Sequence, residues 1–283
     1  MHHFSRKTEV IMVKHGKTYY VPFDMVLQHQ DIYKSASVYL AVLVQSNANG
    51  RAVISLRDII YKMCFTPSRG HAGVNKKIAE TINRLRDLGY FEEAPDYLAM
   101  DRIESAQKFG FKVADIPRGL KTHCGVPADV LERLLYIKRI PMLLNDDKRA
   151  FTLKFCAEAA IRCYFAIRRV LLDWECGAAY VPRAYMAEMA CISEATVTNT
   201  TAFLQTAGFI RKRECFTTDQ TGALRKIMYY TLNDGTDEEI DKRLRGAASG
   251  YIAACQRING CKGKTINGEP VKVSDWGKYK DWV

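Results

Sequence analysis

Two segments of the chain carry apolar residues at helical spacing and stop at a glycine. The earlier segment, residues 75–91, places four apolar residues on one helical face before Gly89: Ile78, Ile82, Leu85 and Leu88. The later segment, residues 193–210, has an equivalent set before Gly208: Val197, Thr201, Leu204 and Ala207. Glycine just past the last helical residue is typical of a helix C-terminus. The pattern predicts two amphipathic helices at matching places in the chain.

A shorter helical pattern precedes each of these helices. Residues 55–64 begin with Ser55 and Asp58, the spacing of a capping box, and residues 181–191 begin with Pro182, which suits a first helical turn. Longer apolar segments lie further upstream, at 35–45 and 151–174, and each is followed by a break that contains glycine.

Short stretches before these segments, 19–27 and 125–131, share a Val-Pro pair followed by Asp and Leu. We interpret the chain as two divergent copies of one module. Cys64 and Cys191 are 127 positions apart, whereas Gly89 and Gly208 are 119 apart, so the first copy has eight extra residues between its two helices. A Pro- and Gly-rich stretch at 65–74 accommodates them, which predicts a loop there.

Hairpin patterns follow each second helix. The later one has strands at 209–216 and 223–232 around a turn at 217–222, and the earlier one has strands at 90–92 and 97–100 around a turn at 94–96. A short helix, a turn, a second helix and a hairpin form a winged helix-turn-helix. We therefore predict a mainly α fold with small β-hairpins (α+β) and two winged helix-turn-helix domains in tandem. The expected domains are 1–105 and 106–235, followed by a C-terminal helix and basic-aromatic tail at 236–283.

Composition narrows the class of protein. The 283 residues include 42 Lys and Arg against 31 Asp and Glu, a formal charge of +11, which favours a polyanionic partner. No apolar run reaches the length of a membrane span, and the N-terminus lacks a signal peptide's apolar core. The nine cysteines are scattered without a C-x-x-C pair, so we expect buried, inert thiols in the cytoplasm of a bacterium.

The later copy resembles bacterial winged-helix DNA-binding proteins. It carries the pattern S-x-x-T-V…L-x-x-x-G-x-I of that family at Ser193, Thr196, Val197, Leu204, Gly208 and Ile210. The tandem arrangement resembles the winged-helix replication initiators of plasmids and other mobile elements, over residues 19–100 and 125–232. The resemblance implies that two related domains grip a repeat in a replication origin. The long loop at 65–74 and the acidic first hairpin depart from the usual pattern.

Candidate DNA contacts follow from this fold, because polar residues near the start of a recognition helix reach base edges and cations hold phosphates. In the later helix the candidates are Ser193, Thr196, Thr198 and Asn199. In its hairpin they are Arg211, Lys212, Arg213, Arg225 and Lys226, which strand alternation divides between two faces. In the earlier copy they are Arg69, Lys76, Lys77, Thr81 and Arg84.

Enzyme motifs are missing from the sequence. G-C-K-G-K-T at 260–265 lacks the first glycine of a phosphate-binding loop, and no histidine pair has the His-x-His spacing of rolling-circle initiators. We expect no catalytic residue, no metal and no cofactor. The expected partner is double-stranded DNA, and the sequence leaves open a homodimer and contacts with the replication or transcription machinery. A winged-helix transcriptional regulator and a winged-helix adaptor that binds protein instead of DNA are the alternatives to a replication initiator.

Overall fold

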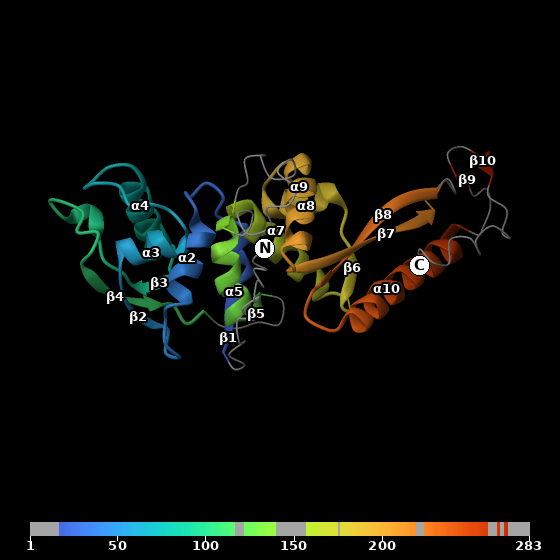
Figure 1. The fold of residues 1–283 in the computed structure, drawn as a ribbon, viewed down its shortest axis with the longest axis horizontal. Helices are drawn as coiled ribbons and strands as arrows, with labels where there is room; N and C mark the ends of the chain where they lie inside the picture. The colour runs from blue at the N-terminus through green and yellow to red at the C-terminus, as the bar shows by residue number, and fades with distance from the viewer. Residues whose placement is uncertain are drawn as a thin grey trace, which may run out of the picture.

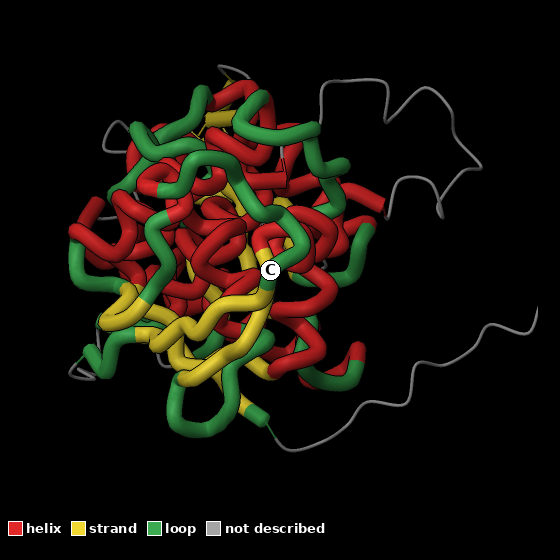
Figure 2. The backbone as a smooth tube through the Cα atoms, turned by 90° about the vertical axis from the view of Figure 1, so that its left-hand side faces the viewer, coloured by secondary structure: helices red, strands yellow, loops and turns green. Residues whose placement is uncertain are grey.

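Helices alternate with short antiparallel strands in a computed structural model of the chain, so the fold is mixed α+β. The structure describes residues 17–116, 122–139, 157–174, 176–218, 224–259, 265–266 and 269–270. The first half of the chain lies at one end of the molecule and the second half at the other (Figure 1). Seen from the end of the first half, the strands of that half lie below its helices (Figure 2).

The first half runs through a strand, two helices, a strand, two helices and two strands. These are β1 (Thr18–Pro22), α1 (Phe23–Leu27), α2 (Ser35–Leu43), β2 (Arg51–Ser55), α3 (Leu56–Lys62), α4 (Gly73–Asp87), β3 (Phe91–Glu93) and β4 (Lys108–Val113). The last three strands form a sheet in the order β2-β4-β3. The predicted capping box begins α3: the Asp58 N–H donates to Ser55 Oγ over 3.1 Å, and the Ser55 N–H donates to Asp58 Oδ2 over 3.0 Å.

Among its described residues, the second half repeats this order. Its elements are β5 (His123–Pro127), α5 (Ala128–Leu135), α7 (Ala157–Leu171), β6 (Ala178–Tyr180), α8 (Arg183–Ala190), α9 (Glu194–Thr206), β7 (Ile210–Thr218) and β8 (Leu224–Leu232). A 3-10 turn, η2 (Tyr136–Arg139), follows α5. The sheet order is β6-β8-β7, so the last strand is again the central one. The repeat predicted from the sequence therefore appears as a repeat of elements and of sheet topology.

Backbone geometry repeats at the places where the sequence copies align. Cys64 and Cys191, which lie just past the ends of α3 and α8, both have positive φ, at 58° and 51°. Gly89 and Gly208 after α4 and α9 have φ of 81° and 73°. Each glycine is followed by the same C-terminal bond, from Tyr90 N–H to Leu85 O and from Phe209 N–H to Leu204 O, both 2.9 Å. The glycines were predictable from the pattern, but the two left-handed cysteines were not.

β1 and β5 join the halves as an antiparallel pair, which the sequence analysis did not predict. Tyr20 lies opposite Gly125, with Pro22 opposite His123 and Thr18 opposite Pro127. The strand ends carry matching bonds, from Phe23 N–H to Thr122 O and from Ala128 N–H to Lys17 O, both 2.9 Å. In the two sequence copies Thr18 is equivalent to His123, and Pro22 is equivalent to Pro127. The pairs Thr18–Pro127 and Pro22–His123 are therefore symmetric, and a local two-fold axis passes between the two strands.

The hydrophobic core is continuous across both halves. All residues of α2 are buried, and most of α7 is buried against it and against α1. The core cluster contains Leu40 and Ile82 from the first half together with Phe165 and Leu204 from the second. Burying each side chain of this size stabilises the fold by roughly 1.5–3 kcal/mol, so α2 and α7 hold the two copies together as one packed unit.

The long helix α10 (Asp237–Asn259) covers the outer side of the second sheet and runs beside the β7–β8 hairpin (Figure 1). Its Ile240, Leu244 and Ala248 form a small separate core with Ile227 and Tyr229 of β8. Two short strands, β9 (Thr265–Ile266) and β10 (Glu269–Pro270), pair farther along the chain. In the ranges given above, no helix is both long and apolar enough to cross a bilayer.

The predicted first hairpin is wrong in its second strand. Residues 97–99 form a 3-10 helix, η1 (Tyr97–Ala99), because Asp96 Oδ1 accepts bonds from the N–H groups of Leu98 and Ala99. The strand that pairs with β3 is β4, which begins eleven residues after Tyr97. The boundary expected at residue 105 therefore separates β4 from its partners, and the first copy extends at least to Val113.

Candidate nucleic-acid interface

The first half of α9 presents a polar surface. Ser193 caps the helix: its Oγ accepts from the Thr196 N–H over 3.1 Å and lies 2.8 Å from Thr196 Oγ1. Thr198 and Asn199 are exposed, and Thr196 is half-buried. On the other side of the helix Val197 and Leu204 are buried in the core, as the spacing predicts. All four predicted contact residues of this helix therefore lie at or near its surface.

Arg183 adds a cation beside this polar face. It comes from the first turn of α8, and its Nε lies 3.6 Å from Glu194 Oε2 while its Nη1 lies 3.5 Å from Thr198 Oγ1. Both side chains of the Arg183–Glu194 pair are more than half exposed, so the pair is weak and solvent-screened. Arg183 was not among the predicted contacts, although its place directly after Pro182 puts it in the first turn of α8.

Three of the four predicted residues of α4 lie on its outer face. Lys76, Lys77 and Arg84 are exposed. The Lys77 Nζ sits 5.3 Å above the Tyr33 ring, and Arg84 Nη2 is 3.2 Å from Asp31 Oδ2. Lys76 has no ion-pair partner among the residues that the structure describes. The outer face of α4 is thus more cationic than that of α9.

Thr81 does not belong to this surface, and its prediction as a DNA contact is wrong. Its exposed fraction is 1%, and its Oγ1 donates to Tyr33 O over 2.6 Å. Position 81 falls on the same helical face as Ile78 and Leu85, which are fully buried. Leu88, expected on that inner face, is 47% exposed because the helix ends one residue earlier, at Asp87.

Asn75 holds the loop that precedes α4 against the helix. Its side chain is fully buried; Oδ1 accepts from Ser68 N–H over 2.9 Å, and Nδ2 donates to the carbonyls of Ser68 and Gly70 over 2.9 and 3.2 Å. Ser68 Oγ in turn accepts from the Val74 N–H over 2.9 Å. Arg69 is exposed in this loop, which the Asn75 hydrogen bonds hold near the start of α4. The sequence could have indicated this contact, because Asn75 is a polar residue on the helical face that carries the buried Ile78.

Two of the five predicted hairpin cations form ion pairs with α10. Arg211 Nη2 is 2.7 Å from Asp237 Oδ1, and Arg213 Nη1 is 2.7 Å from Asp241 Oδ1. Both arginines face α10 because alternate residues of a strand point to the same side. Two carboxylates therefore pair with arginines that were expected to contact phosphate, and of the two pairs the Arg213–Asp241 pair is the less exposed to solvent.

Lys212 points to the other side of the hairpin. Its partner across the strands is Tyr230, whose ring packs in the main core. Partial burial lowers the pKa of Lys212, because removal from water disfavours its charged form. The side chains of Arg225 and Lys226, which belong to β8, lie outside the described part of the structure.

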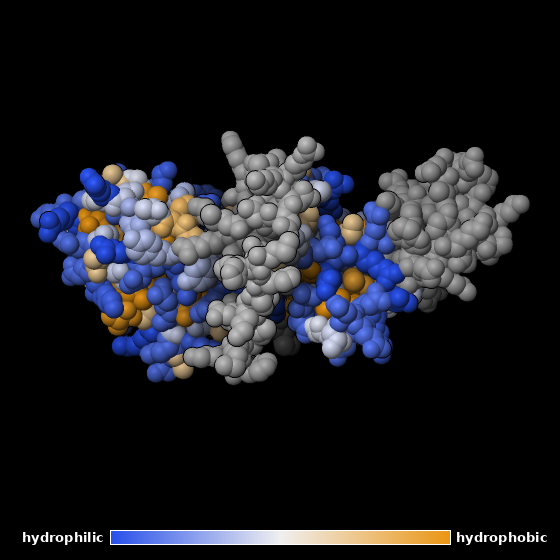
Figure 3. Space-filling view, viewed as in Figure 1, coloured by the Kyte–Doolittle hydropathy of each residue, from blue (hydrophilic) through white to orange (hydrophobic). Residues whose placement is uncertain are grey.

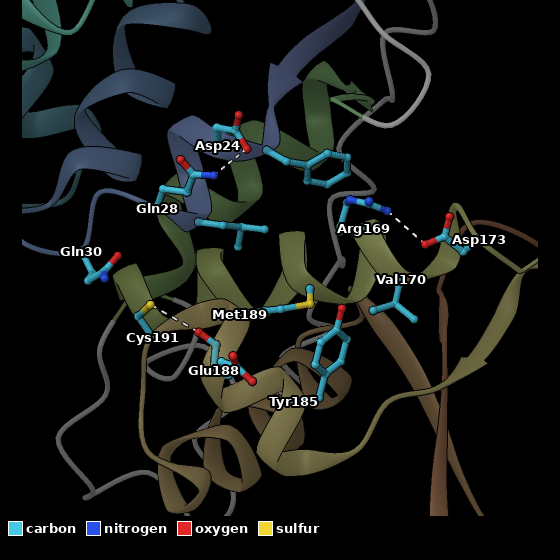
Figure 4. A pocket seen from close by; sticks show the side chains of 12 residues that line it. Asp24, Gln28, Gln30, Arg169, Val170, Asp173, Tyr185, Glu188, Met189 and Cys191 are labelled. Carbon is cyan, nitrogen blue, oxygen red and sulfur yellow. Dashed lines mark hydrogen bonds and ion pairs between the residues drawn. The ribbon is translucent and has the colours of Figure 1, made fainter.

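A crevice of about 510 Å³ opens between α1, α7 and α8, and its charge does not suit phosphate. Figure 4 shows Asp24 and Glu188 from opposite walls and Arg169 bonded to Asp173 at one end. Three carboxylates against a single guanidinium leave the crevice acidic. On the face seen in Figure 3, the coloured surface of both halves is mostly hydrophilic, and apolar residues form only small patches.

Metal ligands do not gather in the described ranges: no three His, Cys, Asp or Glu side chains lie close enough to hold an ion. Two cysteines, Cys124 and Cys163, are buried as expected, and burial raises their pKa values to about 11 and about 12. Cys176 and Cys191 are exposed, contrary to that expectation.

Comparison of the chain with family models, with curated proteins and with solved structures finds no match.

Proposed function

We propose that the chain is a sequence-specific double-stranded DNA-binding protein built from two winged helix-turn-helix modules. The observation that carries the proposal is the repeat itself. Two helices at equivalent places, α4 and α9, each follow a shorter helix, precede a sheet strand and keep a polar or cationic face exposed. A helix presented in this way fits the major groove of B-DNA.

α9 is the better candidate for reading bases. Asn199 has the amide that pairs with the N6 and N7 atoms of adenine, and the methyl group of Thr198 can contact that of thymine. The capped start of the helix offers N–H groups and the positive end of the helix dipole to a phosphate. Glu194 is the one carboxylate on this stretch, and Arg183 lies beside it.

α4 is the better candidate for holding the backbone. Lys76, Lys77 and the loop residue Arg69 are exposed cations near its start. Such contacts fix the register of a protein on DNA without reading sequence. We therefore propose a division of labour in which α4 anchors the chain and α9 selects the site.

The local two-fold axis adds a constraint on the DNA. Because the two copies repeat the same order of described elements on either side of this axis, we propose that α4 and α9 approach the duplex in opposite senses. The site bound by one chain then has two unlike half-sites in opposite orientation. Of the roles open to such a protein we propose replication initiation for a plasmid or other mobile element, on the resemblance of the tandem arrangement.

Selection of tight binders from a random duplex pool tests the proposal. We expect a bipartite consensus, and we expect Asn199→Ala to weaken binding to it by about 1–3 kcal/mol while relaxing preference at one base pair. Thr206→Ala is the matched control, since Thr206 is exposed at the far end of the same helix. Failure to enrich any sequence would contradict a sequence-specific role.

The position of the selected sites separates the two DNA-binding roles. Several copies beside an A·T-rich segment would support an initiator. A single copy overlapping a promoter would instead indicate a transcriptional regulator.

A further inference from the structure

The N-terminus of α2 is capped by a residue from the other half of the chain. Glu158, in the first turn of α7, accepts bonds from the N–H groups of Ala36 and Ser37 over 2.9 and 3.1 Å and from Ser37 Oγ over 2.5 Å. The residue at the cap position, Lys34, makes no side-chain capping bond of its own. Glu158 therefore supplies from α7 the acceptor that a helix start requires.

Arg162, one turn later on α7, extends this contact to the loop before α2. Its Nη2 lies 3.5 Å from Glu158 Oε1 and donates to His29 O and Ser35 Oγ, both over 3.1 Å. Glu158 and Arg162 are 8% and 3% exposed, so solvent does not screen the pair. We call residues 28–34 the 28–34 loop.

The 28–34 loop is also bonded to α4. Thr81 Oγ1 donates to Tyr33 O over 2.6 Å, Arg84 pairs with Asp31 over 3.2 Å, and Lys77 lies over the Tyr33 ring. One side of the loop thus contacts α7 and the other contacts α4. Because α9 packs directly on α7, a short series of contacts joins α9 to α4 through Arg162 and the loop.

We propose that Glu158 and Arg162 are positioning residues that hold α4 in a fixed place relative to α9, and so set the half-site spacing that the chain accepts. The inference rests on the proposed DNA-binding function. Inserting one base pair between half-sites moves one of them by about 3.4 Å along the duplex and about 35° around it. Only a rigid connection between the two helices makes such a shift costly.

Amide hydrogen exchange tests the positioning without DNA. In Arg162→Met we expect exchange in the 28–34 loop and the first turns of α4 to rise by about tenfold or more, because bonds to His29 and Ser35 are lost. Arg102→Met is the matched control, since Arg102 is an exposed loop arginine. Ser37→Ala, which removes one of the bonds to Glu158, is the milder variant if Arg162→Met does not fold, and a smaller rise in the same residues is expected.

Half-site spacing tests the consequence. Wild-type protein should bind the selected duplex about tenfold or more tightly than a duplex with one inserted base pair, and the variant should lose most of that preference. A variant that is only less stable would lose affinity equally at both spacings. Unchanged exchange in α4, or an unchanged spacing preference in a folded variant, overturns the inference. If wild-type protein selects no duplex, the proposed function fails, and the exchange result alone decides whether the pair positions α4.

Discussion

Tyr20 of β1 lies directly opposite Gly125 of β5, and the two residues also occupy equivalent places in the two sequence copies. A β-carbon on residue 125 would lie 3.1 Å from Thr18 Cγ2 and 3.5 Å from Tyr20 Cε1. The small residue on one strand thus makes room for the large one on the other. The two-fold relation between the halves is exact in backbone register here but not in side-chain size.

Replacing Gly125 should destabilise the junction between the halves. We expect Gly125→Val to lower the free energy of unfolding by about 1–3 kcal/mol, because its side chain would crowd Thr18 and the Tyr20 ring. Urea denaturation measures the change. Gly110→Val on β4 is the control, since a β-carbon there meets no described atom within 4 Å. Equal effects of both substitutions would contradict the close approach at Gly125.

Removing the Asn75 amide should release the loop before α4. Asn75→Ala leaves the N–H of Ser68 and the carbonyls of Ser68 and Gly70 without their buried partner, so we expect a loss of about 1–3 kcal/mol in stability. Trypsin should also cleave after Arg69 faster than in the wild-type protein. Asn49→Ala, at an exposed turn, is the control. Unchanged cleavage would show that Asn75 does not hold the loop.

Stability should depend on pH through Lys212. Burial lowers the pKa of Lys212 in the folded state, so the unfolded chain binds its proton more readily. The folded protein should therefore be less stable than Lys212→Met at about pH 7, and the gap should narrow as pH rises past the lowered pKa toward about 10.5. Unfolding of both proteins across this range measures the gap. A gap that is constant with pH would rule out the lowered pKa.

Local pattern predicted the helices well. The apolar spacing of Ile78 and Val197 and the stop at Gly89 and Gly208 reappear in α4 and α9, because helix packing repeats every turn. The two consecutive helices of each half, and hence the repeat, could be predicted from these signals, whereas the strands β1, β2, β5 and β6 were not predicted.

Contacts between distant segments could not be predicted from such spacing. β4 was missed although Phe109, Phe111 and Val113 alternate in the manner of a strand; its pairing with β3 across the 3-10 turn at Tyr97 leaves no local signal. The engagement of Arg211 and Arg213 depends on Asp237 and Asp241 of α10, more than twenty residues away. Glu158 is an acidic residue in an apolar segment, which indicates a buried partner. The spacing does not indicate that this partner is the start of α2.

The salt dependence of duplex binding tests the account most directly, because each phosphate contact contributes about one unit to the slope of log affinity against log salt concentration. Lys76→Gln combined with Lys77→Gln should flatten the slope by roughly 2. Arg211→Gln combined with Arg213→Gln removes the same charge from groups that already pair with α10, so the slope should stay close to that of the wild-type protein. The opposite result, a slope that depends on the hairpin arginines and not on the α4 lysines, would contradict the proposed interface.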